Sequence, residues 1–291
     1  MILSKQELIE YNTRKHDQIA NVEGDQSYDA RHIEIFNPTE QRRLAAELNR
    51  ALTRRRTVNS RILDFGCGTG NLTGKLLGLD REVWAADVSG GMCELVRRRF
   101  PDAVQQGGLK TETMTGEFPL PFPDNHFGFI ATYSVLHHVP DYEMAVRELA
   151  RILQPGGVLY IDHEASADSW RSPLGVRLYR LIKLPYFGLP RLVRRLTSTI
   201  PEEEKISSRT SYLEDLPDEG DIHIFAHDHI EWDVVERIAR EGGVSRIPTK
   251  DYLACNEVSP FPVRYWLCRG LGNNTCLFVG VKESPSPAAI L

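Results

Sequence analysis

The sequence lacks features that would each have pointed to a particular class of protein. It has no C-x-x-C pair, and its cysteines are five in number: Cys67, Cys93, Cys255, Cys268 and Cys276. An odd number at this spacing predicts neither a disulfide framework nor a structural zinc site, and it favours reduced thiols. No apolar run approaches the roughly 18 residues of a membrane-spanning helix. We therefore expect a cytoplasmic protein.

Basic charge is not in excess either. Lys and Arg total 35 against 40 for Asp and Glu, which gives a net charge of -5. Because nucleic-acid binders rely on a basic surface to contact phosphates, this balance argues against a nucleic-acid partner. The N-terminus carries Lys5, Glu7 and Glu10 where a secretion signal needs an apolar run. We expect no such signal.

The chain does contain short apolar runs that alternate with helix-like segments. Strands are predicted at 61–65, 83–87, 127–133, 158–161 and 276–281, and helices at 38–54, 71–79, 92–100, 144–153 and 228–241. Strands and helices that alternate in this way predict an α/β fold, with a parallel sheet covered on both faces.

Residues 165–221 interrupt this alternation. Residues 171–195 contain seven Lys or Arg side chains and no acid, and the stretch that follows, 202–221, is strongly acidic. We interpret 165–221 as a helical lid over an acceptor pocket, in which Arg177, Arg180 and Arg194 attract an anionic or lipid-like molecule. A basic amphipathic segment is also typical of peripheral membrane contact, and the two interpretations are compatible.

A glycine-rich turn follows the strand at 61–65. It reads Gly66-x-Gly68-x-Gly70, with Asp64 two residues before it. Asn71 stands where a dinucleotide fingerprint needs its third glycine, and the Lys-Ser/Thr of a phosphate-binding P-loop is missing. Glycines at the carboxyl end of a strand allow a nucleotide-like ligand to approach the backbone. Asp87, at the end of the next strand, offers a carboxylate to ribose hydroxyls.

These residues resemble the cofactor site of class I S-adenosylmethionine-dependent methyltransferases (methyltransferase type 11-like). The resemblance extends through Leu120-Pro121-Phe122-Pro123-Asp124, Leu136-His137-His138-Val139 and Leu153-Gln154-Pro155-Gly156-Gly157, in the family's order. It implies a three-layer Rossmann-like sandwich. The sheet would be seven-stranded and mostly parallel, with an antiparallel C-terminal strand. The core would comprise 56–164 and 222–283, with a helical extension at 1–55, the insertion at 165–221 and a flexible tail at 284–291.

The resemblance also implies roles for individual residues, with S-adenosyl-L-methionine as cofactor. The residues that would hold its methionine portion and approach the sugar are Asp64, Phe65, Gly66, Cys67, Gly68 and Gly70. Asp87 would take the ribose hydroxyls, and Val88 would pack against the adenine. Glu117 stands where the family usually has an Asp near the adenine amine. Thr132 would present its backbone to the amino-acid end of the cofactor.

Candidate general bases follow the carboxyl ends of the strands, where such sheets bind ligands. His163 and Glu164 rank first because they face the start of the insertion. His137 and His138 follow the fourth strand, and of these two His137 ranks next. Tyr28, in the N-terminal extension, is a candidate to close the pocket. His223, His227 and His229 invite a metal-site interpretation, but no carboxylate or cysteine pattern completes one, so we expect no metal.

These observations favour an enzyme that transfers a methyl group to O, N or C of a small-molecule acceptor such as a lipid, quinone or natural-product intermediate. Alternatives are a regulatory module that binds the cofactor without turnover and a lipid methyltransferase at a membrane surface. RNA or protein methylation is disfavoured by the acidic net charge. It is also disfavoured by Thr132-Tyr133-Ser134-Val135, which stands where amide- and base-methylating enzymes carry Asn-Pro-Pro-aromatic.

Overall fold

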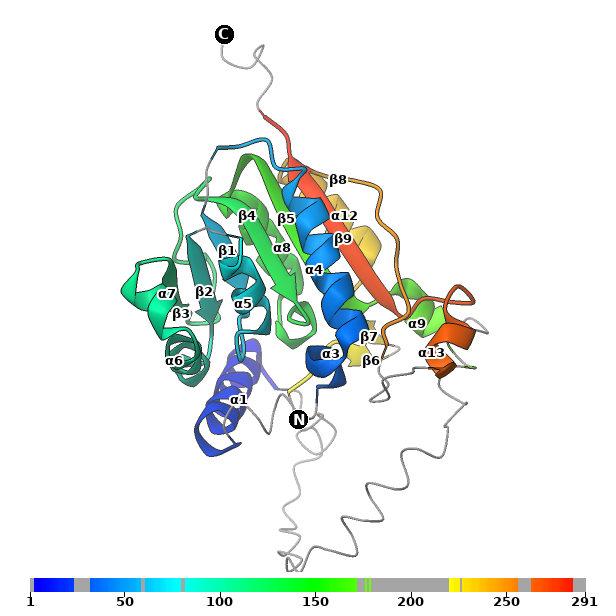
Figure 1. Ribbon diagram of the computed structural model, residues 1–291, viewed down its shortest axis with the longest axis horizontal. Coiled ribbons are helices and arrows are strands. Elements are labelled where there is room, and N and C mark those ends of the chain that lie inside the picture. Colours follow the sequence, from blue (N-terminus) through cyan, green and yellow to red (C-terminus); the bar gives the residue numbers. More distant parts are fainter. Residues whose placement is uncertain are drawn as a thin grey trace, which may run out of the picture.

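A computed structural model describes residues 3–23, 32–58, 61–79, 82–171, 176, 178, 220–225, 227–255 and 263–284. Its centre is a seven-stranded sheet in the order β3-β2-β1-β4-β5-β9-β8 (Figure 1). The strands are β1 (Ile62–Phe65), β2 (Val83–Asp87), β3 (Leu109–Thr113), β4 (Phe127–Tyr133), β5 (Leu153–Ala165), β8 (Val244–Arg246) and β9 (Thr275–Lys282).

The sheet is mostly parallel, as predicted. β1 pairs in parallel with both β2 and β4, with Ile62 opposite Val83 on one side and Phe129 on the other. β9 runs antiparallel to its neighbours β5 and β8. The chain order reverses beside β1, and in open α/β sheets ligands bind at this switch point, outside the carboxyl ends of the strands.

Both faces of the sheet are buried, because alternate strand residues enter two different hydrophobic clusters. Leu63, Ile130 and Leu159 belong to one cluster, and the residues that precede them, Ile62, Phe129 and Val158, belong to the other. The first face is covered by α8 (Tyr142–Ile152) and α12 (Trp232–Glu241), and the second by α4 (Pro38–Leu52) and α5 (Asn71–Leu77). This burial explains why the central strands read as continuous apolar runs.

Two predictions of local structure need correction. The helix expected at 228–241 begins only at Trp232, because Asp228 and His229 form β7 and pair with β6 (Ile224–Phe225). Asp228 contacts His223 and does not cap the helix, whose N-cap residue is Glu231. The strands β3 and β8 were not predicted at all. Both lie at sheet edges, where a strand needs no continuous apolar run.

The N-terminal segment forms helices that lie beyond the carboxyl ends of the parallel strands (Figure 1). They are α1 (Lys5–Gln18), the short π-helix η1 (Ile19–Glu23) and α3 (Ile33–Phe36). Ser4 begins α1 with a capping box, because its hydroxyl accepts from the Glu7 backbone and the Glu7 carboxylate accepts from the Ser4 backbone. The remaining helices are α6 (Gly90–Arg99), α7 (Pro101–Gln105), the 3-10 turn η2 (Leu136–His138), α9 (Ala167–Arg171) and α13 (Val263–Cys268).

Most of the insertion lies outside the described residues. Its first part forms the end of β5 and α9, and its last part, Gly220 and Asp221, returns to the end of η2. The interpretations that involve Arg177, Arg180, Arg194 and Tyr28 therefore fall on undescribed residues. Within the part of the chain that the structure describes, no helix is both long and apolar enough to cross a membrane.

Candidate active site

A cavity of about 300 Å³ opens at the carboxyl ends of β1, β2 and β4. One wall consists of the glycine-rich loop, Asp87 and Val88, and the opposite wall is the segment 133–140 that follows β4. Ile9, Asn12 and His16 of α1 contribute a third side, and Asp221 closes the wall beside η2. The cavity therefore joins the predicted cofactor loop to titratable side chains on the neighbouring strand.

The glycine-rich loop has a backbone that an L-residue would strain. Gly66 has φ +75°, and a Cβ at this position would lie 2.5 Å from both methyl carbons of Val135. Gly70, with φ +88°, is the N-cap residue of α5. The loop thus passes close to the segment after β4 and leaves backbone groups at the cavity, which is the reason for glycine here.

Asp87 is held against this loop by its own hydrogen bonds. Its Oδ2 accepts from the Gly68 backbone at 2.9 Å, and its Oδ1 accepts from the Ser89 backbone at 2.9 Å. The side chain is 7% exposed and lines the cavity. A carboxylate fixed in this way keeps lone pairs available to a diol without having to be ordered on binding.

Asp64 lies behind the loop and does not line the cavity. It is fully buried, and Thr73 Oγ1 donates to its Oδ2. Its Oδ1 has no hydrogen-bond partner among the described residues. Burial, with a smaller contribution from the charge of Asp87, raises the pKa of Asp64 to about 7, against the opposing Thr73 hydrogen bond.

This raised pKa predicts a specific pH dependence of stability. Between about pH 4 and pH 7 the unfolded chain carries an ionised Asp64 while the folded protein keeps it protonated. The free energy of unfolding then falls as the pH rises, by up to about 1.4 kcal/mol per unit. Asp64→Asn removes this titration, so the free energy of unfolding of the variant should rise relative to that of the wild type from pH 4 to pH 7. Urea unfolding at several pH values measures the difference.

The exposed Asp102 of α7 offers a matched control for this comparison. Asp102→Asn should follow the wild-type profile with a constant offset, because a change at this exposed position leaves the buried Asp64 in place. Profiles of Asp64→Asn and wild type that run parallel across the whole range would contradict the assignment.

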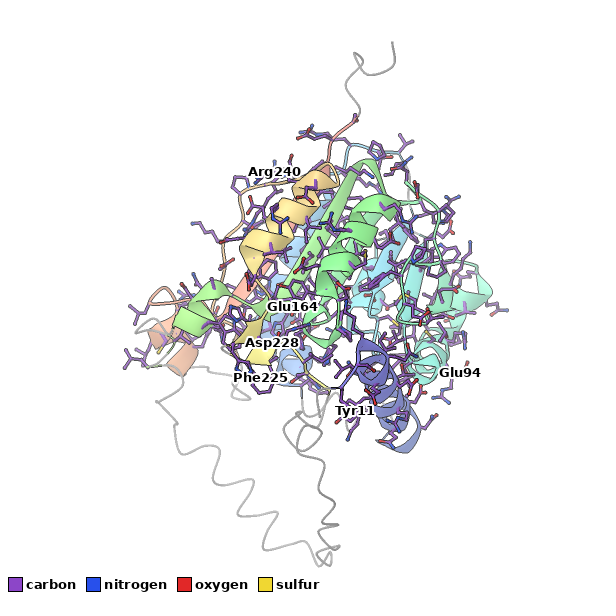
Figure 2. The ribbon with its side chains drawn as sticks, turned by 180° about the vertical axis from the view of Figure 1, so that it is seen from behind. Tyr11, Glu94, Glu164, Phe225, Asp228 and Arg240 are labelled. Carbon is purple, nitrogen blue, oxygen red and sulfur yellow. The ribbon has the colours of Figure 1, made fainter. Side chains whose placement is uncertain are left out.

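Glu164 organises the opposite wall of the cavity. Its Oε1 accepts from the backbones of Val135 and Leu136, both at 2.7 Å, and its Oε2 lies 2.7 Å from His137 Nδ1. Glu164 is 1% exposed and lies at the end of the sheet that is nearest α1 (Figure 2). Burial opposes protonation of His137, but the carboxylates of Glu164 and Asp221 outweigh it and raise its pKa to about 10. With no other cation bound, His137 is thus an imidazolium at neutral pH and a poor general base.

His163 lies away from the cavity. Its backbone has φ +62°, and its ring stacks on Tyr133 with centroids 4.7 Å apart. Its Nδ1 lies 3.2 Å from Tyr133 Oη and 3.3 Å from Tyr252 Oη. Of the three candidate bases, only His137 lines the cavity, and Glu164 reaches it through His137. The catalytic roles of all three stay predictions.

The structure also places the other residues named from the sequence. Those that line the cavity are Phe65, Gly66, Cys67, Gly68, Asp87 and Val88. Gly70 and the buried Thr132 lie behind the lining, and Glu117 is exposed outside it. The histidines at 223, 227 and 229 do not converge, since their neighbours are Asp228, Phe225 and Trp170 respectively.

One important wall residue was missed by sequence reasoning. His138, named from the sequence with His137 because both follow a strand, lines the cavity. Asp221 carried no signal, because the chain brings it to His137 and His138 only after an insertion of more than fifty residues.

The fold and the cavity define a Rossmann-like α/β protein with a cavity at the switch point beside β1, where folds of this class bind nucleotide-like ligands. Residues 63–161 match the family described as methyltransferase domain. The match agrees with the resemblance of the sequence to class I S-adenosylmethionine-dependent methyltransferases.

Individual relatives agree with this family. The chain is 38% identical over 104 residues to a ubiquinone/menaquinone biosynthesis C-methyltransferase of Shewanella sediminis, which is 35% of this chain and 41% of that protein. It is 37% identical over 107 residues to the protein of the same description from Pseudomonas fluorescens, which is 36% of this chain and 41% of the relative. The matches thus span about two fifths of these relatives.

Among solved structures, the fold is similar to magnesium protoporphyrin IX methyltransferase from Synechocystis PCC 6803 with bound S-adenosylmethionine. The TM-score is 0.53 at 11% identity, and the alignment covers 97% of this chain and 99% of that one. A likeness at this level of identity concerns the fold alone.

Proposed function

We propose that this protein transfers a methyl group from S-adenosylmethionine to a small-molecule acceptor. The observation that carries the proposal is the continuous cavity that runs from the glycine-rich loop and Asp87 to the wall of His137, His138 and Asp221. A donor bound at the loop and an acceptor beside η2 would then share one enclosed space, as a displacement at the methyl carbon requires.

The residues around the loop fit the cofactor. Asp87 offers its carboxylate to the ribose hydroxyls, and the apolar side chains of Val88, Met114 and Phe118 line the cavity where an adenine ring would pack. Gly68 lines the cavity, and a Cβ there would meet no neighbouring atom, so the loop places no side chain against the methionine portion at this residue. Glu117 is exposed outside this lining, so we propose no adenine contact for it.

The chemistry resides in the cofactor, whose sulfonium carries the reactive methyl group. The protein's contribution is to hold the acceptor atom in line and to exclude water. Val135 and Val139 supply apolar surface on the acceptor side, and His137 supplies positive charge as an imidazolium when no other cation is bound. This combination suits a ring-bearing acceptor with an acidic oxygen, and a quinone-type acceptor is in keeping with the names of the matched relatives.

The test is transfer of isotope-labelled methyl from S-adenosylmethionine into defined acceptors. Hydroxylated quinone precursors, simple phenols and a small-molecule metabolite extract are incubated separately, and labelled products are identified by chromatography and mass spectrometry. We expect a labelled product in at least one set, and far less of it with Asp87→Ala when the cofactor concentration is near the wild-type dissociation constant. Cofactor binding without transfer in any set would favour a regulatory module instead.

A further inference from the structure

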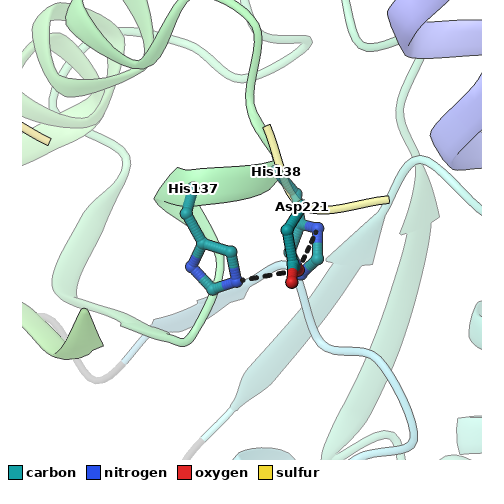
Figure 3. Close-up of side chains that lie close together, drawn as sticks. All are labelled: His137, His138 and Asp221. Atoms are coloured by element: carbon teal, nitrogen blue, oxygen red, sulfur yellow. Dashed lines mark ion pairs between the residues drawn. The ribbon is translucent and has the colours of Figure 1, made fainter. Parts of the chain in front are cut away.

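Three side chains of metal-ligand type meet on the acceptor wall of the cavity. His137 and His138 come from η2, and Asp221 comes from the far end of the insertion (Figure 3). His137 Nε2 lies 3.4 Å from Asp221 Oδ1, and His138 Nδ1 lies 3.5 Å from the same oxygen. Among the described residues, these form the one group whose ligand atoms all lie within 4.8 Å of one another.

These separations are long for hydrogen bonds between charged groups, which usually measure about 2.7–2.9 Å. They match the distance between two ligands of one tetrahedral ion, which is about 3.3–3.4 Å for metal–ligand bonds of about 2.0–2.1 Å. His138 Nδ1 is moreover buried and has no hydrogen-bond partner of normal geometry among the described residues, although the Gly220 backbone lies close to the ring. A cation between the three atoms would satisfy this nitrogen and both carboxylate contacts.

The surrounding hydrogen bonds fix the three groups in place. Glu164 Oε2 engages His137 Nδ1 at 2.7 Å, which leaves Nε2 to face Asp221. A carboxylate that orients a metal-binding histidine through its other ring nitrogen is the usual second layer of such sites. The backbones of Ile222 and His223 donate to His137 O at 2.9 and 3.0 Å, so Asp221 is tied directly to η2. Asn12 Nδ2 donates to His138 O at 2.8 Å.

We propose that His137, His138 and Asp221 bind a divalent transition-metal ion such as Zn²⁺. Two imidazoles and one carboxylate suit such borderline cations, and three protein ligands leave a fourth position open. That position would face the cavity and coordinate an oxygen of the methyl acceptor, an inference that rests on the proposed function. The proposal replaces the sequence-based expectation that the protein binds no metal, and it uses none of the histidines at 223, 227 and 229.

The test uses the full-length protein after treatment with a chelator. Zn²⁺ is titrated by isothermal calorimetry, and Co²⁺ binding is followed by visible absorption, which reports four-coordinate geometry. We expect one equivalent of each metal, without the sulfur-to-cobalt charge-transfer band of a thiolate site. Asp221→Asn and His138→Ala should weaken binding at least about tenfold, the lower range for perturbed metal sites. His227→Ala, which changes an exposed histidine outside the cluster, should bind like the wild type.

Circular dichroism verifies that each variant is folded, and the nearly isosteric Asp221→Asn keeps the test valid if His138→Ala does not fold. The proposal is overturned if the wild type takes up no stoichiometric metal, or if Asp221→Asn and His227→Ala bind it equally well. Binding of S-adenosylmethionine is measured on the same samples. Cofactor binding without metal binding would refute the metal site alone, and loss of both would refute the proposed function as well.

Discussion

Asp87→Ala is expected to weaken binding of S-adenosylmethionine about 10- to 150-fold, which corresponds to about 1.5–3 kcal/mol for hydrogen bonds to a charged group. The carboxylate is the acceptor that we assign to the ribose diol. It also holds the Gly68 and Ser89 backbones at 2.9 Å, so its removal both deletes a ligand contact and releases the loop. Equilibrium dialysis with labelled cofactor measures the change.

Two further variants separate these effects. Asp87→Asn keeps one carbonyl acceptor and should lose less affinity than Asp87→Ala. Glu117→Gln should leave affinity within about twofold, because Glu117 is exposed outside the cavity lining and makes at most a screened contact. An Asp87→Ala protein that binds the cofactor as tightly as wild type would refute the assignment of the ribose site.

Arg43→Met should lower the free energy of unfolding by about 3–5 kcal/mol, the usual cost of breaking one side of a buried ion pair. Arg43 of α4 contacts the fully buried Asp162 through Nη1 at 3.0 Å and Nη2 at 3.1 Å. Its Nε also contacts Glu40 at 2.9 Å, and Glu40 is 1% exposed. Methionine fills a similar volume but leaves both carboxylates without a cation. Urea unfolding measures the loss.

The same helix provides the control. Arg50 contacts Glu47 at the surface with its side chain 73% exposed, so Arg50→Met should change stability by less than about 1 kcal/mol. Combining Arg43→Met with Asp162→Asn should recover part of the loss, because one of the unpaired charges is then removed. Equal losses in the Arg43 and Arg50 variants would show that this pair does not fix α4 to β5.

The sequence predicted the central part of the fold well because its strands are buried on both faces. Such strands are continuous apolar runs, and glycine-rich turns separate them from the helices. β3 escaped prediction because, as an edge strand, it buries only Leu109 and otherwise presents Lys, Thr and Glu. The start of α12 was misplaced because polar residues ahead of a helix also suit a short hairpin. The structure forms such a hairpin, in which Asp228 pairs with Phe225.

The candidate site likewise has one part that the sequence predicted and one part that it did not. The loop and Asp87 are local signals, since their chemistry follows from position at the end of a strand. The acceptor wall depends on contacts between residues far apart in sequence. Glu164 lies near the end of β5 and contacts His137, which follows β4. Asp221 reaches this wall only after the insertion. His163 was ranked first from the sequence but lies away from the cavity. The β-bulge between Asp162 and Glu164 breaks the alternation of side-chain directions that sequence position alone would suggest.

Calorimetric titration of the wild-type protein with S-adenosylmethionine, and then with its demethylated product S-adenosylhomocysteine, tests the central claim most directly. We predict one binding site for either molecule and competition between them. We also predict stabilisation by about 2.7 kcal/mol when the free ligand is 100-fold above its dissociation constant. Absence of binding heat and of thermal stabilisation with both ligands at millimolar concentration would contradict the claim that this cavity is a methyltransferase cofactor site.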